Sequence, residues 1–274
     1  MQLQRRPLGR TGMCVSEIGL GTWALGSLGR HEGAWNYGYI PEHVTREVLE
    51  TYVEAGGNHI DSAHNYHDAE QRIGAFLRTY GKRDELIITS KVWQTDETTV
   101  RQKLEETLRW LGTDYIDIYY MHNPPDDPGE MERVLDLYDT LREEGKIRAI
   151  GATLKGHNVR DETVDLIRQY VRSGRVDVVM CICSVLRQKN IVTFAEAAER
   201  GVGIVLRTVL ESGFLTGKYK PGHRFTQEQD HRRRWPEERL DQILALIQDF
   251  SAQTVNPPWD SPAKVAIRFA LDLP

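Results

Sequence analysis

The alternation of short β-branched runs with longer amphipathic segments constrains the fold of this sequence more than any other feature. Candidate strands cover residues 15–21, 58–61, 85–91, 114–122, 147–151, 176–182 and 202–207. Helical patterns lie between them, over residues 42–56, 69–79, 97–111, 130–145, 160–173 and 190–200. Because strands that alternate with helices at this spacing build βαβ units, the sequence predicts a parallel sheet covered by helices.

Two architectures fit that pattern, a (β/α)8 barrel and a doubly wound sheet. A doubly wound dinucleotide-binding sheet usually carries a G-x-G-x-x-G turn after its first strand, with a helix directly behind it. This chain has GLGTWALG there, and no helical pattern follows at once. A length of 274 residues suits one barrel. We therefore predict an α/β fold, a (β/α)8 TIM barrel, as a single domain over residues 1–274.

The last third of the chain departs from the rhythm. A polar segment over residues 208–235 precedes a helical pattern at 236–250, and the final stretch SPAKVAIRFALDLP is helical as well. A loop of that length in a compact domain is usually functional or disordered. No run for an eighth strand and its helix follows, so we expect the barrel to be incomplete at its C-terminal side within these residues.

Composition excludes several classes of protein. The 35 basic and 40 acidic side chains leave a net charge of −5, which does not favour binding to nucleic acid or to an anionic membrane. No apolar run is long enough to span a bilayer, and the N-terminus MQLQRRPLGR lacks the apolar core of a secretory signal. The three cysteines, Cys14, Cys181 and Cys183, are too few for a disulfide framework. A reduced cytoplasmic protein is the expectation.

Ionisable side chains end three consecutive candidate strands. Asp61 ends the candidate strand 58–61, within the motif IDSAHNY, and Tyr66 lies in the loop that follows it. Lys91 is the last residue of ITSK, and His122 directly follows IDIYYM. In barrels of this kind the active site gathers at the C-terminal ends of the strands. We therefore expect these four side chains to point into one small volume.

The residue types suggest a specific chemistry. A free phenol has a pKa of about 10, and a lysine ammonium beside it favours phenolate and lowers that pKa. An aspartate would hold the lysine charged and oriented. The tyrosine can then act as a general acid toward a carbonyl oxygen, while a neutral histidine hydrogen-bonds the same oxygen.

Each of these residues also has an ordinary structural explanation. A strand-end aspartate is often a helix N-cap, a role for which Ser62 and Asn65 compete here. A lysine after a strand is usually a solvated head on a buried stem. A histidine before NPP is commonly bonded to the loop backbone. The catalytic interpretation is favoured because all four occur together.

These residues resemble the motifs of the aldo-keto reductase family, along nearly the whole chain. PLGRTGMCVSEIGLGTWALG looks like the family's opening hairpin and first strand, and GVGIVLRTVLESGFLTGKY looks like its seventh strand and pyrophosphate loop. IDSAHNY, ITSK and LGTDYIDIYYMHNP match the aspartate–tyrosine, lysine and histidine motifs. The resemblance implies a barrel that binds NADP(H), or alternatively NAD(H), and transfers hydride to a carbonyl carbon.

The resemblance also implies roles for individual residues. Asp61 and Lys91 would tune Tyr66, the proton donor, and His122 would orient the carbonyl. Cofactor contacts carried over to matching positions are Thr22, Asp61, Thr153, Met180, Arg207, Thr208, Leu210, Ser212 and Lys218.

Three positions depart from the family's pattern. Leu154 and Met180 stand where an asparagine and a glutamine commonly hydrogen-bond the nicotinamide carboxamide, and Arg207 stands where many members stack a tyrosine on the ring. Losing two neutral hydrogen bonds would weaken cofactor binding by roughly 1–3 kcal/mol. A planar guanidinium can stack in place of the tyrosine.

Other residues have weaker assignments. Trp23, His64 and Trp93 are candidate substrate-pocket residues, and Trp35 and Tyr37 are further aromatic residues expected near the mouth. His64 and His67 with nearby carboxylates match no metal motif, so no metal site is predicted. The run DHRRRWPEER is interpreted as a solvated helix start with Pro236 in the first turn, with phosphate contact as the alternative.

The leading hypothesis is a reductase of a small aldehyde, ketone or sugar, or the reverse alcohol dehydrogenase, with a small-molecule substrate and an oligomeric state that the sequence leaves open. A cofactor-sensing regulatory or interaction subunit on the same fold is the second. A barrel isomerase or hydrolase that uses Asp61 and His122 without a nicotinamide is the third.

Overall fold

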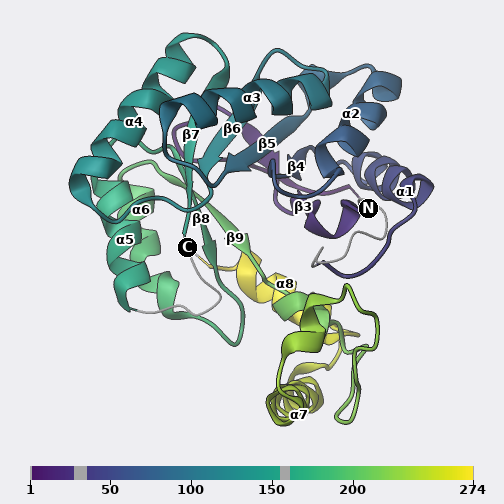
Figure 1. The fold of residues 1–274 in the computed structure, drawn as a ribbon. Helices are drawn as coiled ribbons and strands as arrows, with labels where there is room; N and C mark the ends of the chain where they lie inside the picture. Colours follow the sequence, from purple (N-terminus) through teal and green to yellow (C-terminus); the bar gives the residue numbers. More distant parts are fainter. Residues whose placement is uncertain (1, 28–35, 155–160, 274) are drawn as a thin grey trace.

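The core of the protein is a curved sheet of seven parallel strands with helices along its outer face (Figure 1). The structure is a computed structural model that describes residues 2–27, 36–154 and 161–273. The strands follow one another in chain order, β3-β4-β5-β6-β7-β8-β9, and each is parallel to its neighbours. This is the strand order of a (β/α)8 barrel, so the predicted fold class is confirmed. Within the described residues β3 and β9 are the two outer strands of the sheet.

The strands lie close to the predicted runs. Their bounds are β3 Leu20–Gly21, β4 His59–Asp61, β5 Ile87–Val92, β6 Ile116–Met121, β7 Ile147–Thr153, β8 Val178–Ile182 and β9 Gly203–Arg207. The prediction of one strand over residues 15–21 is wrong. Cys14–Ser16 forms β2, which pairs antiparallel with β1, Arg5–Pro7, and the chain turns before it enters β3.

The helices also follow the predicted pattern. They are α1 Glu42–Glu54, α2 Ala69–Tyr80, α3 Glu97–Leu111, α4 Pro128–Glu143, α5 Asp161–Arg172, α6 Phe194–Glu199, α7 Glu237–Thr254 and α8 Pro262–Leu271. Asp96 and Asp127 cap α3 and α4 by accepting backbone N–H bonds from Thr99 and Glu130. Capping of this kind fixes where each helix begins after its strand.

Alternate residues of the strands build two separate cores. Ile118 and Tyr120 of β6 pack with Val178 and Met180 of β8 inside the curve of the sheet. Their neighbours Tyr119, Met121, Val179 and Cys181 pack outward against the helices. This period of two is expected when both faces of a sheet are covered.

The β1–β2 hairpin closes the N-terminal end of the sheet. Its Leu8, Met13 and Val15 belong to the inner core. A Cβ on Gly9 would lie 2.3 Å from the backbone nitrogen of Gly203, so glycine is required where the hairpin touches the start of β9. The hairpin therefore leaves the C-terminal end of the sheet as the accessible mouth.

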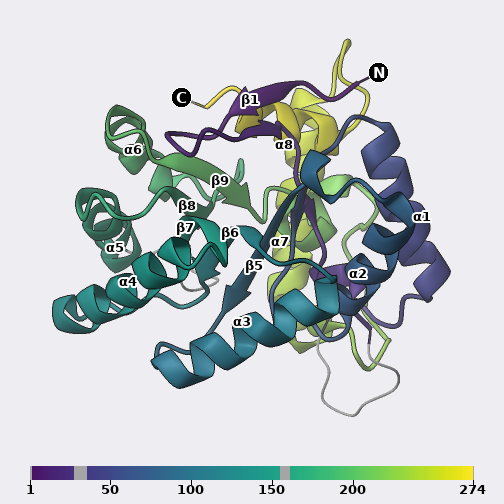
Figure 2. The same ribbon diagram turned by 90° about the horizontal axis from the view of Figure 1, so that it is seen from above.

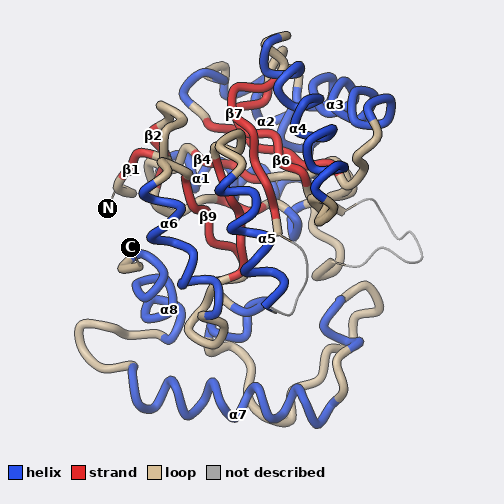
Figure 3. Tube along the Cα trace, turned by 90° about the vertical axis from the view of Figure 1, so that its left-hand side faces the viewer, coloured by secondary structure: helices blue, strands red, loops and turns tan. Residues whose placement is uncertain are grey.

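The segment 208–235 is ordered and packs with α7 and α8 beside the sheet (Figures 2 and 3). It contains two 3-10 turns, Glu211–Thr216 and His231–Arg234. The run DHRRRWPEER does contain an exposed helix start, because α7 begins at Glu237 with Pro236 as its N-cap. The prediction that the whole run is solvated is wrong, because Asp230, His231 and Arg232 are buried. The Arg232 guanidinium pairs with Asp230 at 2.7 Å and lies over three aromatic rings, which supply the burial.

Candidate active site

Asp61 and Lys91 form a buried ion pair at the ends of β4 and β5. Lys91 is 1% exposed, and its Nζ donates to both oxygens of Asp61 at 2.7 and 2.8 Å and to the Ser62 carbonyl at 2.6 Å. The Thr89 hydroxyl donates to the same carboxylate at 2.7 Å. Asp61 therefore caps no helix, and the Lys91 head is not solvated. The pair is held rigidly and has no net charge.

Tyr66 lies beside this pair. The Lys91 Nζ is 5.1 Å from the centre of the Tyr66 ring, close enough for the charge to act on the phenol. Removal from water raises the pKa of Tyr66 above its ordinary value, and the Lys91 charge offsets only part of that rise. The sign of the predicted lysine effect is right, but desolvation outweighs it. Tyr66 is consequently protonated at neutral pH, as a proton donor must be.

His122 faces Tyr66 across the mouth. Their ring centres are 6.0 Å apart at 78°, and the exposed ring of Trp93 lies 4.7 Å from His122 on its other side. Burial, followed by the charges of Lys91 and Arg207, lowers the pKa of His122 to about 3, so the imidazole is neutral. Its Nδ1 is buried without a hydrogen-bond partner among the described residues. A buried polar atom in this state suits a ligand group that the protein itself does not supply.

Arg207 ends β9 on the other side of the mouth. Its Nη2 donates to the carbonyl of Leu154, just after β7, at 3.0 Å. Because β8 lies between β7 and β9, the guanidinium reaches across the end of that strand. Its Nε is buried with no partner among the described residues.

The other predicted cofactor residues surround this opening. Thr22 and Thr153 are buried at the ends of β3 and β7, and Met180 is buried in the middle of β8, where it belongs to the inner core. After β9 the backbone of Thr208, Glu211 and Ser212 adopts positive φ angles of 63°, 49° and 56°. Non-glycine residues in that conformation are strained and concentrate at ligand sites. Leu210 lies within the same turn, whereas Lys218 is exposed beyond it.

The predicted substrate-pocket residues separate into two groups. Trp93 borders the mouth through His122, and Trp23 packs at 5.3 Å against Tyr37, after the first strand. His64 is not brought to them: its Nε2 bonds Glu106 of α3 at 2.8 Å and its ring stacks on Trp110. Trp35 lies outside the described residues.

Sequence reasoning missed two contributors to the site. Thr89 has the alternation of a strand residue two positions before Lys91, which was the signal that it shares the mouth-facing side. His231 packs 4.9 Å from the rings of both Trp23 and Tyr37, and no local pattern in DHRRRW indicates that contact.

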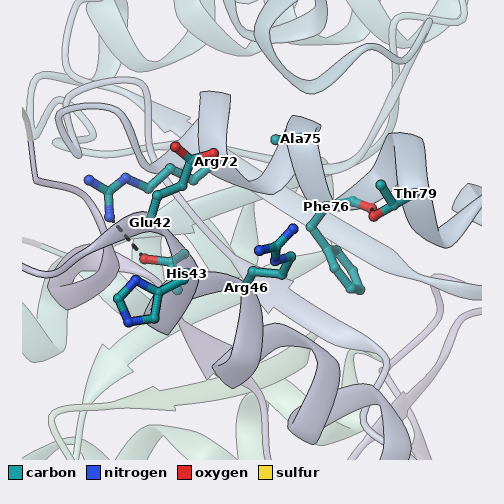
Figure 4. A pocket seen from close by; sticks show the side chains of 8 residues that line it. Glu42, His43, Arg46, Arg72, Ala75, Phe76 and Thr79 are labelled. Carbon is teal, nitrogen blue, oxygen red and sulfur yellow. Dashed lines mark hydrogen bonds between the residues drawn. The ribbon is translucent and has the colours of Figure 1, made fainter.

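A hollow of about 330 Å³ between α1 and α2 lies away from this site (Figure 4). Glu42, His43, Arg46 and Arg72 line it, and none of the four candidate catalytic residues does. The guanidinium of Arg72 is fully engaged there, with donors to Thr45 and to the carbonyls of Leu25, Ser27 and Ile40. The Arg72 side chain in this hollow therefore holds the fold together and is not aimed at a ligand.

The arrangement at the mouth can protonate an oxygen that develops negative charge. A neutral phenol and a neutral imidazole with an unpartnered nitrogen lie 6.0 Å apart between ring centres, next to the lysine cation that Asp61 fixes. Among the described residues no group of three or more His, Cys, Asp or Glu side chains could hold a metal ion. No helix in the described part of the chain is long and apolar enough to cross a membrane.

Comparisons with known proteins point the same way. The family model described as "Aldo/keto reductase family" matches residues 17–274. The aldo-keto reductase YhdN of Bacillus subtilis is 26% identical, over 96% of this chain and 80% of its own length. The NADH-specific methylglyoxal reductase of Escherichia coli is 29% identical, over 80% of this chain and 72% of its own length.

Solved structures show the same fold. The holo form of the aldo-keto reductase AKR11C1 from Bacillus halodurans superposes with a TM-score of 0.76 at 24% identity, covering 99% of this chain and 83% of that one. The glycerol dehydrogenase AKR11B4 from Gluconobacter oxydans gives a TM-score of 0.76 at 22% identity, covering 100% and 84%.

Proposed function

The chain belongs to the aldo/keto reductase family, and from that premise we propose that it is a nicotinamide-dependent oxidoreductase. It interconverts a small aldehyde, ketone or sugar carbonyl with the corresponding alcohol. The observation that carries the proposal is the buried Lys91–Asp61 pair beside Tyr66, with the neutral His122 facing the phenol.

The four residues take distinct roles in carbonyl reduction. When bound, the reduced nicotinamide supplies the hydride that forms the new C–H bond at the carbonyl carbon. Tyr66 gives its phenolic proton to the carbonyl oxygen, so the C=O double bond becomes a C–OH single bond. His122 hydrogen-bonds that oxygen, and Lys91, oriented by Asp61, stabilises the phenolate that remains on Tyr66. Alcohol oxidation is the reverse.

The residues around the mouth fit a nicotinamide cofactor. The Nδ1 of His122 and the Nε–H of Arg207 are buried without a partner in the described residues, and both are polar groups that a ligand could satisfy. We assign Thr22, Thr153, Met180, Arg207, Thr208, Leu210, Ser212 and Lys218 to its binding. We propose NADP(H) as the preferred cofactor and NAD(H) as the alternative, since one relative is named as NADH-specific.

The proposed substrate class rests on one wall of the site and on the names of the relatives. Trp93, half exposed over His122, offers an apolar wall next to the reacting oxygen. Two relatives are named as methylglyoxal reductases and one structural neighbour as a glycerol dehydrogenase. Small dicarbonyls and polyols are therefore the first compounds to test.

We propose that the protein is cytoplasmic, because its three cysteines are free, as is usual in a reducing compartment. We also propose that residues 1–274 form one barrel domain.

A fluorescence titration with NADPH and NADH, followed by turnover of methylglyoxal, tests the proposal. We expect binding at micromolar concentrations of at least one nucleotide and oxidation of that nucleotide only when the carbonyl is present. Absence of binding to both nucleotides would contradict the proposal.

A cofactor-sensing regulatory subunit is the second candidate. It is favoured by one observation: Leu154 and Met180 are buried and offer no donor or strong acceptor for a carboxamide. Tight nucleotide binding without turnover across a panel of small carbonyls, together with a stable complex with another chain in gel filtration, would replace the first proposal with this one.

A further inference from the structure

Arg207 carries a charge that the rest of the mouth does not balance. Asp61 and Lys91 neutralise each other, and His122 is neutral. The structure records no ion pair for Arg207 within residues 2–27, 36–154 and 161–273, although its Nε is buried. Elsewhere in the described chain, buried arginines have carboxylate partners: Arg72 pairs with Asp68 and Arg232 with Asp230. An arginine cannot shed its proton in a protein, so the charge persists.

A hydrogen bond to the backbone fixes the Arg207 guanidinium next to the residues that would bind the carbonyl oxygen. The guanidinium reaches from β9 across the end of β8 to the Leu154 carbonyl. From there its charge acts on both Tyr66 and His122, which hold the reacting oxygen. A hydride donor must lie within contact distance of the carbonyl carbon attached to that oxygen. Whatever its exact pose, a nicotinamide ring that reacts here therefore lies within the field of Arg207.

The two oxidation states of the ring respond differently to this field. The reduced ring is neutral, and loss of hydride leaves a ring with one positive charge. The phosphates and sugars are the same in both states, so their attraction to the protein cancels in a ratio of affinities. Only the repulsion between Arg207 and the oxidised ring remains.

We infer that Arg207 makes the site select the reduced nicotinamide cofactor over the oxidised one. This inference rests on the proposed function and deepens it, because it addresses the direction of the reaction. Unit charges about 6–10 Å apart at an effective dielectric of about 20 interact strongly enough to change an affinity by roughly tenfold to a hundredfold. The resting complex contains reduced cofactor, and oxidised cofactor dissociates readily after turnover. Both effects favour carbonyl reduction.

The test compares dissociation constants without any carbonyl substrate. NADPH and NADP⁺, and separately NADH and NAD⁺, are titrated into the wild-type protein by isothermal titration calorimetry. We expect the oxidised form to bind about tenfold to a hundredfold more weakly than the reduced form. Equal affinities, or tighter binding of the oxidised form, would overturn the inference even if no variant were made.

Two variants of Arg207 and one matched control locate the effect. Arg207→Gln should lower the ratio at least fivefold, whereas Arg207→Lys keeps the charge and should retain most of it. Arg148→Gln removes the same charge from an exposed side chain near the start of β7, at the opposite end of the sheet, where Asp117 keeps Arg83 as its partner. It should leave the ratio unchanged, because a distant exposed charge is screened.

The outcomes separate this inference from the function on which it rests. If the wild type binds neither nucleotide pair, the proposed function fails and the inference falls with it. If both states bind and Arg207→Gln leaves the ratio as in the wild type, the function stands and the role of Arg207 is refuted. An equal drop in Arg148→Gln and Arg207→Gln would show a general effect of net charge and would also refute it.

Discussion

The two ends of the sheet differ in whether their buried polar side chains have hydrogen-bond partners within the protein. At the closed end Asp117 and Asp177 each receive two arginines and a backbone N–H: Arg83, Arg148 and Ile88 for the first, Arg10, Arg142 and Ile150 for the second. At the mouth, His122 and Arg207 retain buried nitrogens without partners in the described chain. Polar groups that stabilise a fold are satisfied within it, and those that serve a ligand are left incomplete.

Within the described residues, buried atoms without a partner also occur away from the mouth, including the hydroxyls of Tyr119 and Tyr138 and, at the closed end, a nitrogen of His59. The Nε2 of His59 is buried without a partner in the described residues, and burial lowers the pKa of this histidine. Its ring packs against Gly19, where an added Cβ would lie 3.0 Å from Nδ1. An unpartnered atom is thus informative only where other candidate site residues surround it, as at the mouth, where His122 lies beside Tyr66 and Trp93.

A pair of tyrosines gives the strongest test of the contrast between the two ends. Tyr66→Phe should reduce kcat by roughly a hundredfold to ten-thousandfold, because it removes the general acid, and should leave nucleotide affinity nearly unchanged. Tyr52→Phe removes a hydroxyl at the closed end that bonds the carbonyls of Ile18 and His59. It should cost about 1–3 kcal/mol of unfolding free energy with kcat unaltered.

Steady-state kinetics and urea denaturation of both variants separate these outcomes. If Tyr66→Phe retained full turnover, or if Tyr52→Phe abolished it without unfolding the protein, the assignment of roles to the two ends would be wrong.

Glu70 tests whether hydrogen bonds within the protein are enough to keep a buried carboxyl group at its ordinary pKa. It lies on α2, 1% exposed, and accepts hydrogen bonds from Ser90 at 2.5 Å and Thr107 at 2.9 Å. Burial nevertheless raises its pKa from 4.5 to about 7. Between these values the unfolded chain releases a proton that the folded chain keeps, so stability falls as pH rises from about 4.5 to 7 and then levels off.

Glu70→Gln should remove that pH dependence and stabilise the protein at pH values above 7, by roughly 3 kcal/mol at most. The measurement is the urea midpoint as a function of pH. Glu50→Gln, an exposed change of the same type on α1, serves as the control and should follow the wild-type curve. Parallel curves for wild type and Glu70→Gln would show that Glu70 is ionised in the folded protein.

The smallest expected effect concerns His122, which should not titrate in the pH range where the enzyme is assayed. Because the pKa of His122 is lowered to about 3, the imidazole should stay neutral throughout the neutral range. The profile of kcat/KM should therefore show no histidine inflection between about pH 5 and 8, where an ordinary histidine titrates. An inflection near pH 6.5 that disappears in His122→Gln would contradict this geometry.

The sequence predicted the elements that local pattern controls. Helix and strand positions followed from periodicity, and the grouping of Asp61, Lys91 and His122 followed from the rule that parallel strands share their C-terminal ends. The prediction failed where distant contacts decide. The pattern of residues 15–21 predicted one strand, but its first two residues pair with Arg5–Pro7 in a hairpin.

Burial of charged residues was the other source of error. Arg232 looked solvated because its partners, Tyr37 and Phe225, come from other parts of the chain. The net pKa shift of Tyr66 also depended on desolvation, which no residue spacing reveals. In both cases the outcome depends on the cost of burying a group relative to its interactions with residues distant in the sequence, which the local sequence does not show.

The contact between Asn36 and the 208–235 segment has a consequence for the order in which the protein folds. Asn36 donates its backbone N–H to Gln229 and accepts one from His231, and thereby joins the chain just after β3 to the chain well beyond β9. These contacts close a loop of nearly two hundred residues, and the entropy of that closure must be overcome before the contacts can stabilise anything. The order of folding therefore places this fastening late, after the βαβ units have formed from near neighbours. By the same reasoning, we expect the contact between Asn36 and the 208–235 segment to be among the first to open when stability is lost.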